Sequence, residues 1–487
     1  MKKIFLLAAV TLGLGLTSCD LTTDPEIYLD SDKALSTFAG LDDAAAVTYS
    51  AFRGEGWYGL DTQLYPDVMC GNCVAGIPLN SGRGSNWQTW NFTKAGGGPV
   101  FGSAYANILR CNNVIFAIKQ NADMYLKEEG VTQQDLDNIM AECLFVRALS
   151  YFDLVRWYAQ PYAISSTAAE GTPESLGMPI TSEDPNVSVI EKPVRATAEE
   201  NYNAIISDLI QALTIIDPSY VRAGVNDAKC AVSVGAIEAL LARVYLYKQD
   251  YTNAALHATN VINSGNYTIA TAAEYETLWG NSTWEATGEI IFGAYVSQQE
   301  GSLNSSPGNL THPDEYGDIR VSEDLIKLFD SKDVRFTMLR TSDKHAGYYW
   351  PNKYQGKDGG PIAYSSIPMI RISEMYLVRA EARYLSGDQN GALSDLNIIA
   401  SNRNATEYAT VSMNDIFNER RKEMAFEGHL FYDYKRLIGT PYQRDMVRTD
   451  VSSQINKDVP ADSKYWTMPI VESEFDVNPN LVQNPGW

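Results

Sequence analysis

The chain has 487 residues, more than the roughly 250–300 at which one hydrophobic core stops growing, so two lobes or an array of repeats is expected. It carries 60 acidic and 38 basic residues, and the formal net charge of -22 repels phosphate backbones and anionic lipids. No basic patch in the sequence offsets this charge, so nucleic acid is not expected as a partner. Aromatic residues reach 11% of the chain, a surplus that favours a ligand-binding surface.

The N-terminus predicts a lipoprotein signal peptide over residues 1–18. Two lysines precede an apolar run from Ile4 to Leu16, which is too short to span a bilayer, and small residues follow. The sequence LTSC at residues 16–19 resembles a bacterial lipobox, in which Cys19 is lipidated and becomes the first residue of the mature chain. An ordinary secretory signal with a chance cysteine is the alternative.

Residues 19–35 predict an acidic tether behind the lipobox. The acids of this segment are Asp20, Asp24, Glu26, Asp30 and Asp32. Such a tether resembles the signals that send some Gram-negative lipoproteins to the outside of the outer membrane. No later apolar run is long enough for a transmembrane helix, so we expect an outer-membrane protein that is lipid-anchored and faces the cell exterior.

The cysteines after Cys19 give no strong signal for a metal or a redox site. Cys70 and Cys73 form a C-x-x-C, but neither the preceding strand nor the following helix of a redox motif is evident. A zinc site would need a second pair, and the remaining cysteines are isolated in helical patterns: Cys111, Cys143 and Cys230. A loop-stiffening disulfide and free thiols both stay open.

The dominant hydrophobic period is 3.6, which predicts short amphipathic helices separated by turns. One apolar face, in a helix closed by Pro161, is formed by Ala141, Leu144, Ala148, Phe152 and Val155. Residues 234–265 predict a helical hairpin whose second helix starts at about Thr252 and stops at Gly265. A related pair is predicted over residues 374–402, with a turn at Gly387. Such pairs resemble tetratricopeptide repeats, in which small residues let helices approach closely.

Long segments rich in Gly, Ser, Asn and Pro separate these helices. They cover residues 53–104, 159–196, 265–320 and 341–368. Loops of this length usually carry function or join a second lobe.

Four parts of the sequence resemble, in this order, the hallmarks of the SusD/RagB family. The first, N-terminal part combines two segments, YANILRCNNVI and AECLFVRALSYFDLVRWYAQPY, and the three C-terminal parts are RISEMYLVRAEARYLSGD, IFNERRKEMAFEGHLFYDYKRL and YWTMPIVESEFDVNPNLVQNPGW. The resemblance implies a mainly α fold, in which tetratricopeptide-like helix pairs form a right-handed superhelical scaffold with an irregular loop-rich lobe. It also implies three regions: residues 36–230 and 321–487 as the N- and C-terminal family regions, and residues 231–320 as a central helix pair with ligand loops.

The function implied by this resemblance is that of a cell-surface glycan-binding lipoprotein. Such proteins capture oligo- or polysaccharides and cap a SusC-like TonB-dependent outer-membrane transporter, to which they deliver the glycan. Two alternatives stay open: a peptide-binding member of the RagB type and an α-helical glycoside hydrolase.

Catalytic signatures are missing from the sequence. It contains no H-E-x-x-H, no G-x-S-x-G elbow and no G-x-x-x-x-G-K-[ST] loop, and no catalytic residue, metal or cofactor is predicted. The acids Glu419, Glu423 and Glu427 recur at helical spacing among basic residues. They could form a hydrolytic carboxylate pair, but we interpret them as ion pairs that join a helix to its neighbours.

The first candidate ligand site is the stretch NSGRGSNWQTWNF at residues 80–92. Trp87 and Trp90 could stack on sugar rings, and Arg83 and Asn91 beside them have the right groups for sugar hydroxyls. The alternative is that both tryptophans fill the core of the irregular lobe.

Other aromatic residues are further candidates for stacking on a ligand, and we rank them below the first site. Trp57 and Tyr58 form a second glycine-flanked pair, and a third group is formed by Tyr348, Tyr349 and Trp350. The family resemblance adds the loop after the central helix pair, which contains Trp279, Trp284 and Tyr295. Their positions vary between family members, so no single residue transfers directly.

Overall fold

The computed structural model describes residues 31–96, 98–188, 191–280, 284, 288–297, 304–357, 360–451 and 457–487. The predicted signal peptide and Cys19 lie outside the described residues. Within these residues, no helix is both long and apolar enough to cross a bilayer.

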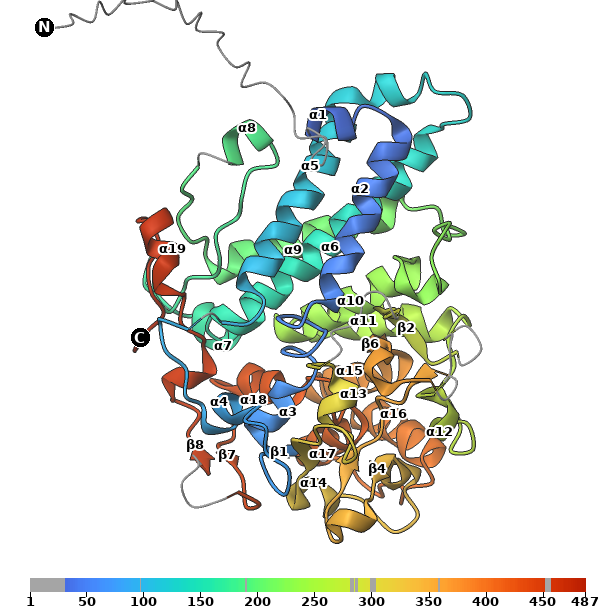
Figure 1. The fold of residues 1–487 in the computed structure, drawn as a ribbon, viewed down its shortest axis with the longest axis vertical. Coiled ribbons are helices and arrows are strands. Elements are labelled where there is room, and N and C mark those ends of the chain that lie inside the picture. The colour runs from blue at the N-terminus through green and yellow to red at the C-terminus, as the bar shows by residue number, and fades with distance from the viewer. Residues whose placement is uncertain are drawn as a thin grey trace, which may run out of the picture.

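Long helices dominate the first half of the chain, in the upper part of Figure 1. They are α2 (Phe38–Ser50), α5 (Phe101–Tyr125), α6 (Gln133–Tyr158) and α9 (Ala198–Ile215), and the short α1 (Ser31–Ala34) precedes them. The central helix is α6, which packs between α5 and α9 and is buried almost all round. Its start is fixed by a capping box in which Thr132 and Asp135 satisfy each other's backbone N–H groups.

Two helix hairpins continue this array. The first pairs α10 (Val234–Tyr247) with α11 (Tyr251–Asn263), and the second pairs α15 (Ile372–Leu385) with α16 (Gln389–Asn402). In both, an aspartate caps the second helix: Asp250 accepts from the N–H of Asn253, and Asp388 from that of Gly391. The turn predicted at Gly387 is confirmed, with φ of 90°. Because α11 also packs on α15, the predicted pairs form one continuous helical layer.

Short helices fill the segments between and after these pairs. They are α3 (Tyr65–Cys70), α4 (Ser85–Thr89), α7 (Tyr162–Ser165), α8 (Pro185–Ser188), α12 (Tyr275–Leu278), α13 (Pro307–Leu310), α14 (Glu323–Ile326), α17 (Met413–Glu423), α18 (Leu430–Leu437) and α19 (Glu472–Val477).

The described strands form four two-stranded antiparallel sheets. They pair β1 (Cys73–Ala75) with β3 (Ile319–Val321), β2 (Ile290–Ala294) with β6 (Ile367–Arg371), β4 (Leu339–Arg340) with β5 (Trp350–Pro351), and β7 (Met446–Val447) with β8 (Asp458–Val459). Three of these sheets contain strands from the segments that the sequence predicted as long irregular loops. Short antiparallel strand pairs therefore hold the loop-rich lobe together. The mainly helical fold predicted from the sequence is confirmed.

Three hydrophobic clusters divide the described interior. The largest lies mainly among the long helices, the second lies around α3, β1 and β3, and the smallest lies around α12 and the start of β2. The C-x-x-C contributes to the two larger clusters, because Cys70 packs into the largest cluster and Cys73 into the second. Both side chains are buried free thiols, which resolves the alternative left open by the sequence.

The segment around α3 is tied to the C-terminal part of the chain. The Asp67 carboxylate accepts hydrogen bonds from the backbone N–H groups of Phe426, at 3.2 Å, and Gly428, at 3.0 Å. Gly428 has φ of 75°, and a Cβ there would meet the Thr62 carbonyl oxygen at 1.9 Å, so only glycine fits. Arg421 donates to the Gly71 carbonyl at 2.8 Å. Segments far apart in sequence therefore form one packed unit, in which α3, α4 and α18 lie together (Figure 1).

The C-terminal tail is packed, as its pattern of turn formers and apolar residues predicts. The Asn484 amide donates to the carbonyl oxygens of Tyr158, at 2.8 Å, and Met468, at 2.6 Å. The Arg195 guanidinium in turn donates to the Asn484 amide oxygen at 2.9 Å. These bonds hold the tail against the end of α6.

Candidate functional site

The loop around α4 is shaped by two residues in left-handed conformations. Gly84 precedes α4 with φ of 78°, and Trp90 ends it with φ of 55°, a conformation that strains a residue with a side chain. The Trp90 indole N–H donates to the Met69 carbonyl at 3.0 Å, and its ring centroid lies 5.0 Å from that of Trp466. With 1% exposure, Trp90 is an anchor in the core, which is the alternative role stated for it above.

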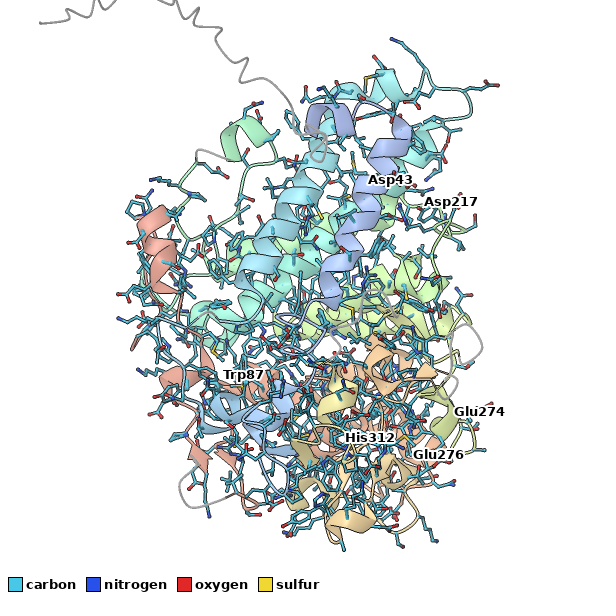
Figure 2. All side chains as sticks on the ribbon, viewed as in Figure 1. Asp43, Trp87, Asp217, Glu274, Glu276 and His312 are labelled. Carbon is cyan, nitrogen blue, oxygen red and sulfur yellow. The ribbon has the colours of Figure 1, made fainter. Side chains whose placement is uncertain are left out.

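Trp87, one turn earlier, lies where the two larger hydrophobic clusters meet. It is half-buried and contacts both clusters, and it stacks on Tyr65 with ring centroids 4.9 Å apart and planes inclined by 21°. Phe92 and Trp157 lie edge-on or tilted at 5.3 and 5.9 Å. Figure 2 places Trp87 at the upper edge of the segment that contains α3 and α4, next to the helical part. Its ring is fixed by aromatic neighbours and is still partly exposed.

A cavity of about 200 Å³ opens beside this ring. Its described lining residues are Asn86, Trp87, Asn91, Phe92, Thr93, Gly96, Gly98, Pro99, Met468 and Pro469. This lining combines two aromatic rings with two side-chain amides and contains no charged side chain. Such a surface offers apolar faces together with neutral hydrogen-bond donors and acceptors.

Of the residues predicted for the first site, Trp87 and Asn91 come together on this cavity, whereas Arg83 lies beyond its lining. The Arg83 guanidinium stacks 4.0 Å over the ring of Tyr316 and donates to the Ser81 hydroxyl at 2.7 Å. Asn91 is exposed, and its backbone N–H donates to the Asn86 carbonyl at 3.0 Å, which holds the turn that carries its side chain.

The other predicted aromatic residues are mostly core residues in this structure. Trp57, Tyr58, Trp284 and Trp350 are buried. The indole N–H of Trp57 donates to the Asp153 carboxylate at 2.7 Å, and that of Trp350 to the Gly317 carbonyl at 2.8 Å. Tyr295 is half-buried under the Lys357 ammonium group, which lies 3.1 Å from its ring centroid. None of these five lines the cavity beside Trp87, so a ligand-binding role for them stays a prediction.

Sequence reasoning missed several residues of this site. Phe92 and Asn86 lie within the stretch that was singled out, but nothing in the pattern distinguished them from their neighbours. Tyr65 supports the ring of Trp87 from α3, and Met468 reaches the cavity from the C-terminal region. No local pattern could reveal these two, because their role depends on tertiary packing between distant segments.

A half-buried acid lies near this group of rings. Burial and the neighbouring Glu55 raise the pKa of the Asp61 carboxyl to about 7. Burial raises the pKa of the Tyr65 hydroxyl above its usual range, and the nearby charge of Asp61 adds to that shift. Asp61 therefore lies close to the ring on which Trp87 stacks.

The acids around α17 are engaged in buried ion pairs. Glu419 contacts Arg335 at 2.7 Å, Glu423 contacts Arg371 at 3.0 Å and Arg403 at 2.8 Å, and Glu427 contacts Arg371 and Lys353, both at 2.7 Å. Although burial alone would raise it, the charges of Arg403 and Arg371 hold the pKa of Glu423 well below its usual range. The three carboxylates are at most 6% exposed, so their interpretation as structural ion pairs is confirmed.

Comparisons with known proteins agree with this architecture. A family model described as "SusD family" matches residues 337–487, and one described as "Starch-binding associating with outer membrane" matches residues 79–246. A solved structure from Bacteroides vulgatus, described as a putative sugar binding protein, is 30% identical. It aligns over 93% of this chain and 99% of its own length with a TM-score of 0.79. The chain belongs to the SusD/RagB family.

Two further SusD relatives match along essentially the whole chain. A SusD superfamily protein from Bacteroides thetaiotaomicron is 28% identical over 92% of this chain and 100% of its own, with a TM-score of 0.80. The SusD-like protein P2 of Formosa agariphila is 24% identical, with 100% of both chains covered. The SusD/RagB resemblance inferred from the four parts of the sequence is thus confirmed.

Proposed function

We propose that the protein is a cell-surface glycan-binding lipoprotein that captures oligo- or polysaccharide beside Trp87 and delivers it to a SusC-like TonB-dependent transporter. The observation that carries the proposal is the half-exposed Trp87 ring on a 200 Å³ cavity that the amides of Asn86 and Asn91 also line. A sugar ring has an apolar C–H face and hydroxyls at its edge. The indole therefore stacks on the face, and the amides exchange hydrogen bonds with the hydroxyls.

The relatives support a glycan over a peptide. One matching family model is described as starch-binding, and the 30% identical solved structure as sugar binding. The cavity agrees with this choice because its lining residues carry no charge with which to fix a peptide terminus.

Binding without hydrolysis fits the same lining. Glycoside hydrolysis uses two carboxyl groups roughly 5–9.5 Å apart on either side of the scissile bond. The described lining residues contribute none, and the acids around α17 are held in buried ion pairs. The ligand therefore leaves the site unchanged.

Anchoring through Cys19 follows from the lipobox. A cysteine that carries more than one acyl chain anchors stably, whereas a single chain binds a membrane only marginally. We expect Cys19→Ala to release the protein from membranes of cells that lack the transporter, and protease added to intact cells to degrade the wild type. Full membrane retention of the variant, or protection of the wild type, would contradict the surface anchor.

Delivery requires a lasting complex with the transporter. A permanent interface of this kind buries well above ~1,600 Å². Purification from native membranes in mild detergent should recover a β-barrel partner together with the protein. Repeated recovery of this chain alone would count against delivery.

The ligand site is tested by isothermal titration with a panel of neutral oligosaccharides and, in parallel, oligopeptides. We expect one oligosaccharide class to bind with a Kd on the order of micromolar to millimolar. Trp87→Ala should weaken this binding by about 2 kcal/mol, roughly 30-fold, because it removes the stacking face. Asn91→Ala, at an exposed position, should cost about 1 kcal/mol without changing the melting temperature.

Tyr384→Ala is the matched control, since it removes a half-buried ring that does not line this cavity and is not among the candidate ligand-binding residues. It should leave the oligosaccharide Kd unchanged. Binding of peptides alone would replace the glycan proposal with the RagB-type alternative. Release of reducing ends from a bound polysaccharide would replace it with hydrolysis.

A further inference from the structure

A larger cavity, of about 640 Å³, lies away from Trp87 and has a different chemistry. It is lined by Glu276, Thr277, Gly280, Arg340, Asn352, Gln355, Gly356, Gly360 and Ile362. In Figure 2, Glu276 is labelled at the opposite side of the molecule from Trp87. The described lining residues of this larger cavity include no aromatic ring but do include a cation, which the described lining of the Trp87 cavity lacks.

The cation is Arg340, at the end of β4. Its guanidinium donates to the Asn352 amide oxygen, and it forms no ion pair within the part of the chain that the structure describes. Buried arginines elsewhere are neutralised, as Arg371 is by three glutamates. A guanidinium has five N–H donors, so Arg340 has both charge and hydrogen bonds to offer to a ligand.

Burial supports the same conclusion. Arg340 is half-buried, and loss of water lowers the pKa of its guanidinium from the usual value. An arginine remains charged at neutral pH even so. A bound anion would stabilise this half-buried guanidinium by pairing with its charge.

Amide groups stand next to this cation. The Gln355 amide nitrogen donates to the Asn352 carbonyl at 2.9 Å, which turns the rest of the side-chain amide toward Gly280. A Cβ on Gly280 would come within 3.1 Å of the Gln355 amide oxygen, so the glycine keeps space open beside this acceptor. At Gly356 a Cβ would meet the Gly360 carbonyl oxygen at 1.7 Å, so the loop forming this wall closes only with glycine.

Glu276 adds an acid to the cavity lining. It lies on α12 and is exposed, in contrast to the half-buried Arg340. A carboxylate accepts hydrogen bonds from hydroxyl groups but repels an anion. A ligand that suits both ends therefore carries one anionic group and several hydroxyls.

We propose that this cavity is a second ligand site, which binds a sugar carrying a carboxylate or sulfate group. The anionic group pairs with the Arg340 guanidinium, whose planar donor fork matches two oxygens of either group. Hydroxyls of the same sugar bond to the amides of Asn352 and Gln355 and to Glu276. The site lies apart from the Trp87 cavity and takes charged saccharides, whereas that cavity suits neutral ones.

The test is titration of the full-length protein, observed by NMR, with glucuronate, glucose 6-sulfate, glucose and inorganic sulfate. We expect at least one of the two acidic sugars to bind with a millimolar Kd. Glucose and inorganic sulfate should each bind at least 10-fold more weakly than that sugar. The two acidic probes distinguish a carboxylate ligand from a sulfate ligand. The proposal is overturned if neither acidic sugar binds at up to roughly 50 mM, or if inorganic sulfate binds as tightly as they do.

Three variants make the test specific. Arg340→Gln keeps a donor for Asn352 but removes the charge, and it should weaken acidic-sugar binding at least 10-fold. Glu276→Gln removes the repelling charge at an exposed position and should strengthen binding about 2-fold to 3-fold. Lys344→Gln, which removes an exposed surface cation paired with Asp314, should change nothing.

An unchanged Kd in Arg340→Gln would overturn the site, and so would equal losses in Arg340→Gln and Lys344→Gln. If Arg340→Gln does not fold, the sign of the Glu276→Gln effect still decides. Weaker or unchanged binding of the acidic sugar in Glu276→Gln contradicts the proposal.

Discussion

Two acids, Glu423 and Asp61, show how the ion-pair network around α17 differs from the region near Trp87. Burial alone would raise the pKa of each carboxyl group. Glu423 is surrounded by Arg371, Arg403 and Arg335, which together hold its pKa well below the usual range. Asp61 has Glu55 as a neighbour, and its pKa rises to about 7.

The difference lies in whether the neighbours compensate for burial. Around α17 every buried carboxylate has guanidinium or ammonium partners, so this region is committed to holding the fold together. Near Trp87 an acid lies half-buried beside another acid, and an indole ring stays half-exposed on a cavity. Residues whose interactions are incomplete in the free protein are the ones a ligand can use.

Breaking the charge network should have the largest effect. Arg371→Met removes a guanidinium that contacts Glu289, Glu423 and Glu427 and should lower the free energy of unfolding by about 3–5 kcal/mol. Urea denaturation followed by circular dichroism measures the loss. Lys327→Met, which breaks an exposed pair with Glu323, is the control and should have little or no effect. Equal losses in the two variants would contradict the contrast.

Removing Trp90, which anchors the loop around α4 in the core, should have the next largest effect on stability. Trp90→Ala deletes a ring that is 1% exposed together with its hydrogen bond to Met69, and should cost about 3 kcal/mol of stability. Trp87→Ala should cost clearly less stability but more affinity, because its ring is half-exposed on the cavity. Thermal melting and ligand titration on both variants separate the roles. Retained stability in Trp90→Ala would mean that the anchor is misassigned.

The sequence allowed the helical part to be predicted far better than the site. Periodicity alone located both helix hairpins, because apolar spacing and the stop at Gly265 are local signals. Spacing also led to the ion-pair interpretation of Glu423, since acids and bases alternate on its helix. The ladders inside the long loops were not predicted, because their strands are two to five residues long and pair across distant segments.

For the candidate site, composition singled out a stretch that contributes residues to a cavity but could not tell its two tryptophans apart. Trp87 and Trp90 have the same chemistry and the same glycine-rich setting. Only the positive φ of Trp90, which turns its ring into the core, separates the anchor from the exposed ring. The same limit explains Trp57 and Trp350, which the sequence offered as candidate ligand-binding rings and tertiary packing buries.

The pH dependence of the free energy of unfolding tests the contrast between Asp61 and Glu423. The pKa of Asp61 is about 7 in the folded protein and near 3.8 when unfolded, so folding favours its protonated form. Its stabilising contribution is complete below about pH 4 and is lost as the pH rises through about 7. Asp61→Asn should therefore be more stable than the wild type by about 2 kcal/mol at pH 8, and this difference should shrink toward pH 4. Urea denaturation at several pH values measures it, and a difference independent of pH would contradict the assignment.

Reducing agent should have the smallest effect. Cys70 and Cys73 are buried free thiols in separate clusters, and burial raises the pKa of both well above the usual value. The melting temperature should be the same with and without dithiothreitol, and the native thiols should react slowly with an aromatic disulfide reagent. A mass increase on reduction of the peptide that contains both cysteines would reveal a disulfide and contradict this prediction.

The bonds between Asp67 and the backbone at residues 426–428 make the order of synthesis matter for this protein. A chain grows at about 5–20 residues per second, so the segment that carries Trp87 exists for roughly tens of seconds before its C-terminal partners are made. Until then Asp67 lacks the donors of Phe426 and Gly428, and the cavity lacks its Met468 wall. A polypeptide terminated before Met468 would consequently be produced without a complete ligand cavity. The cavity proposed to bind the glycan is thereby completed only in chains that have been translated past Pro469.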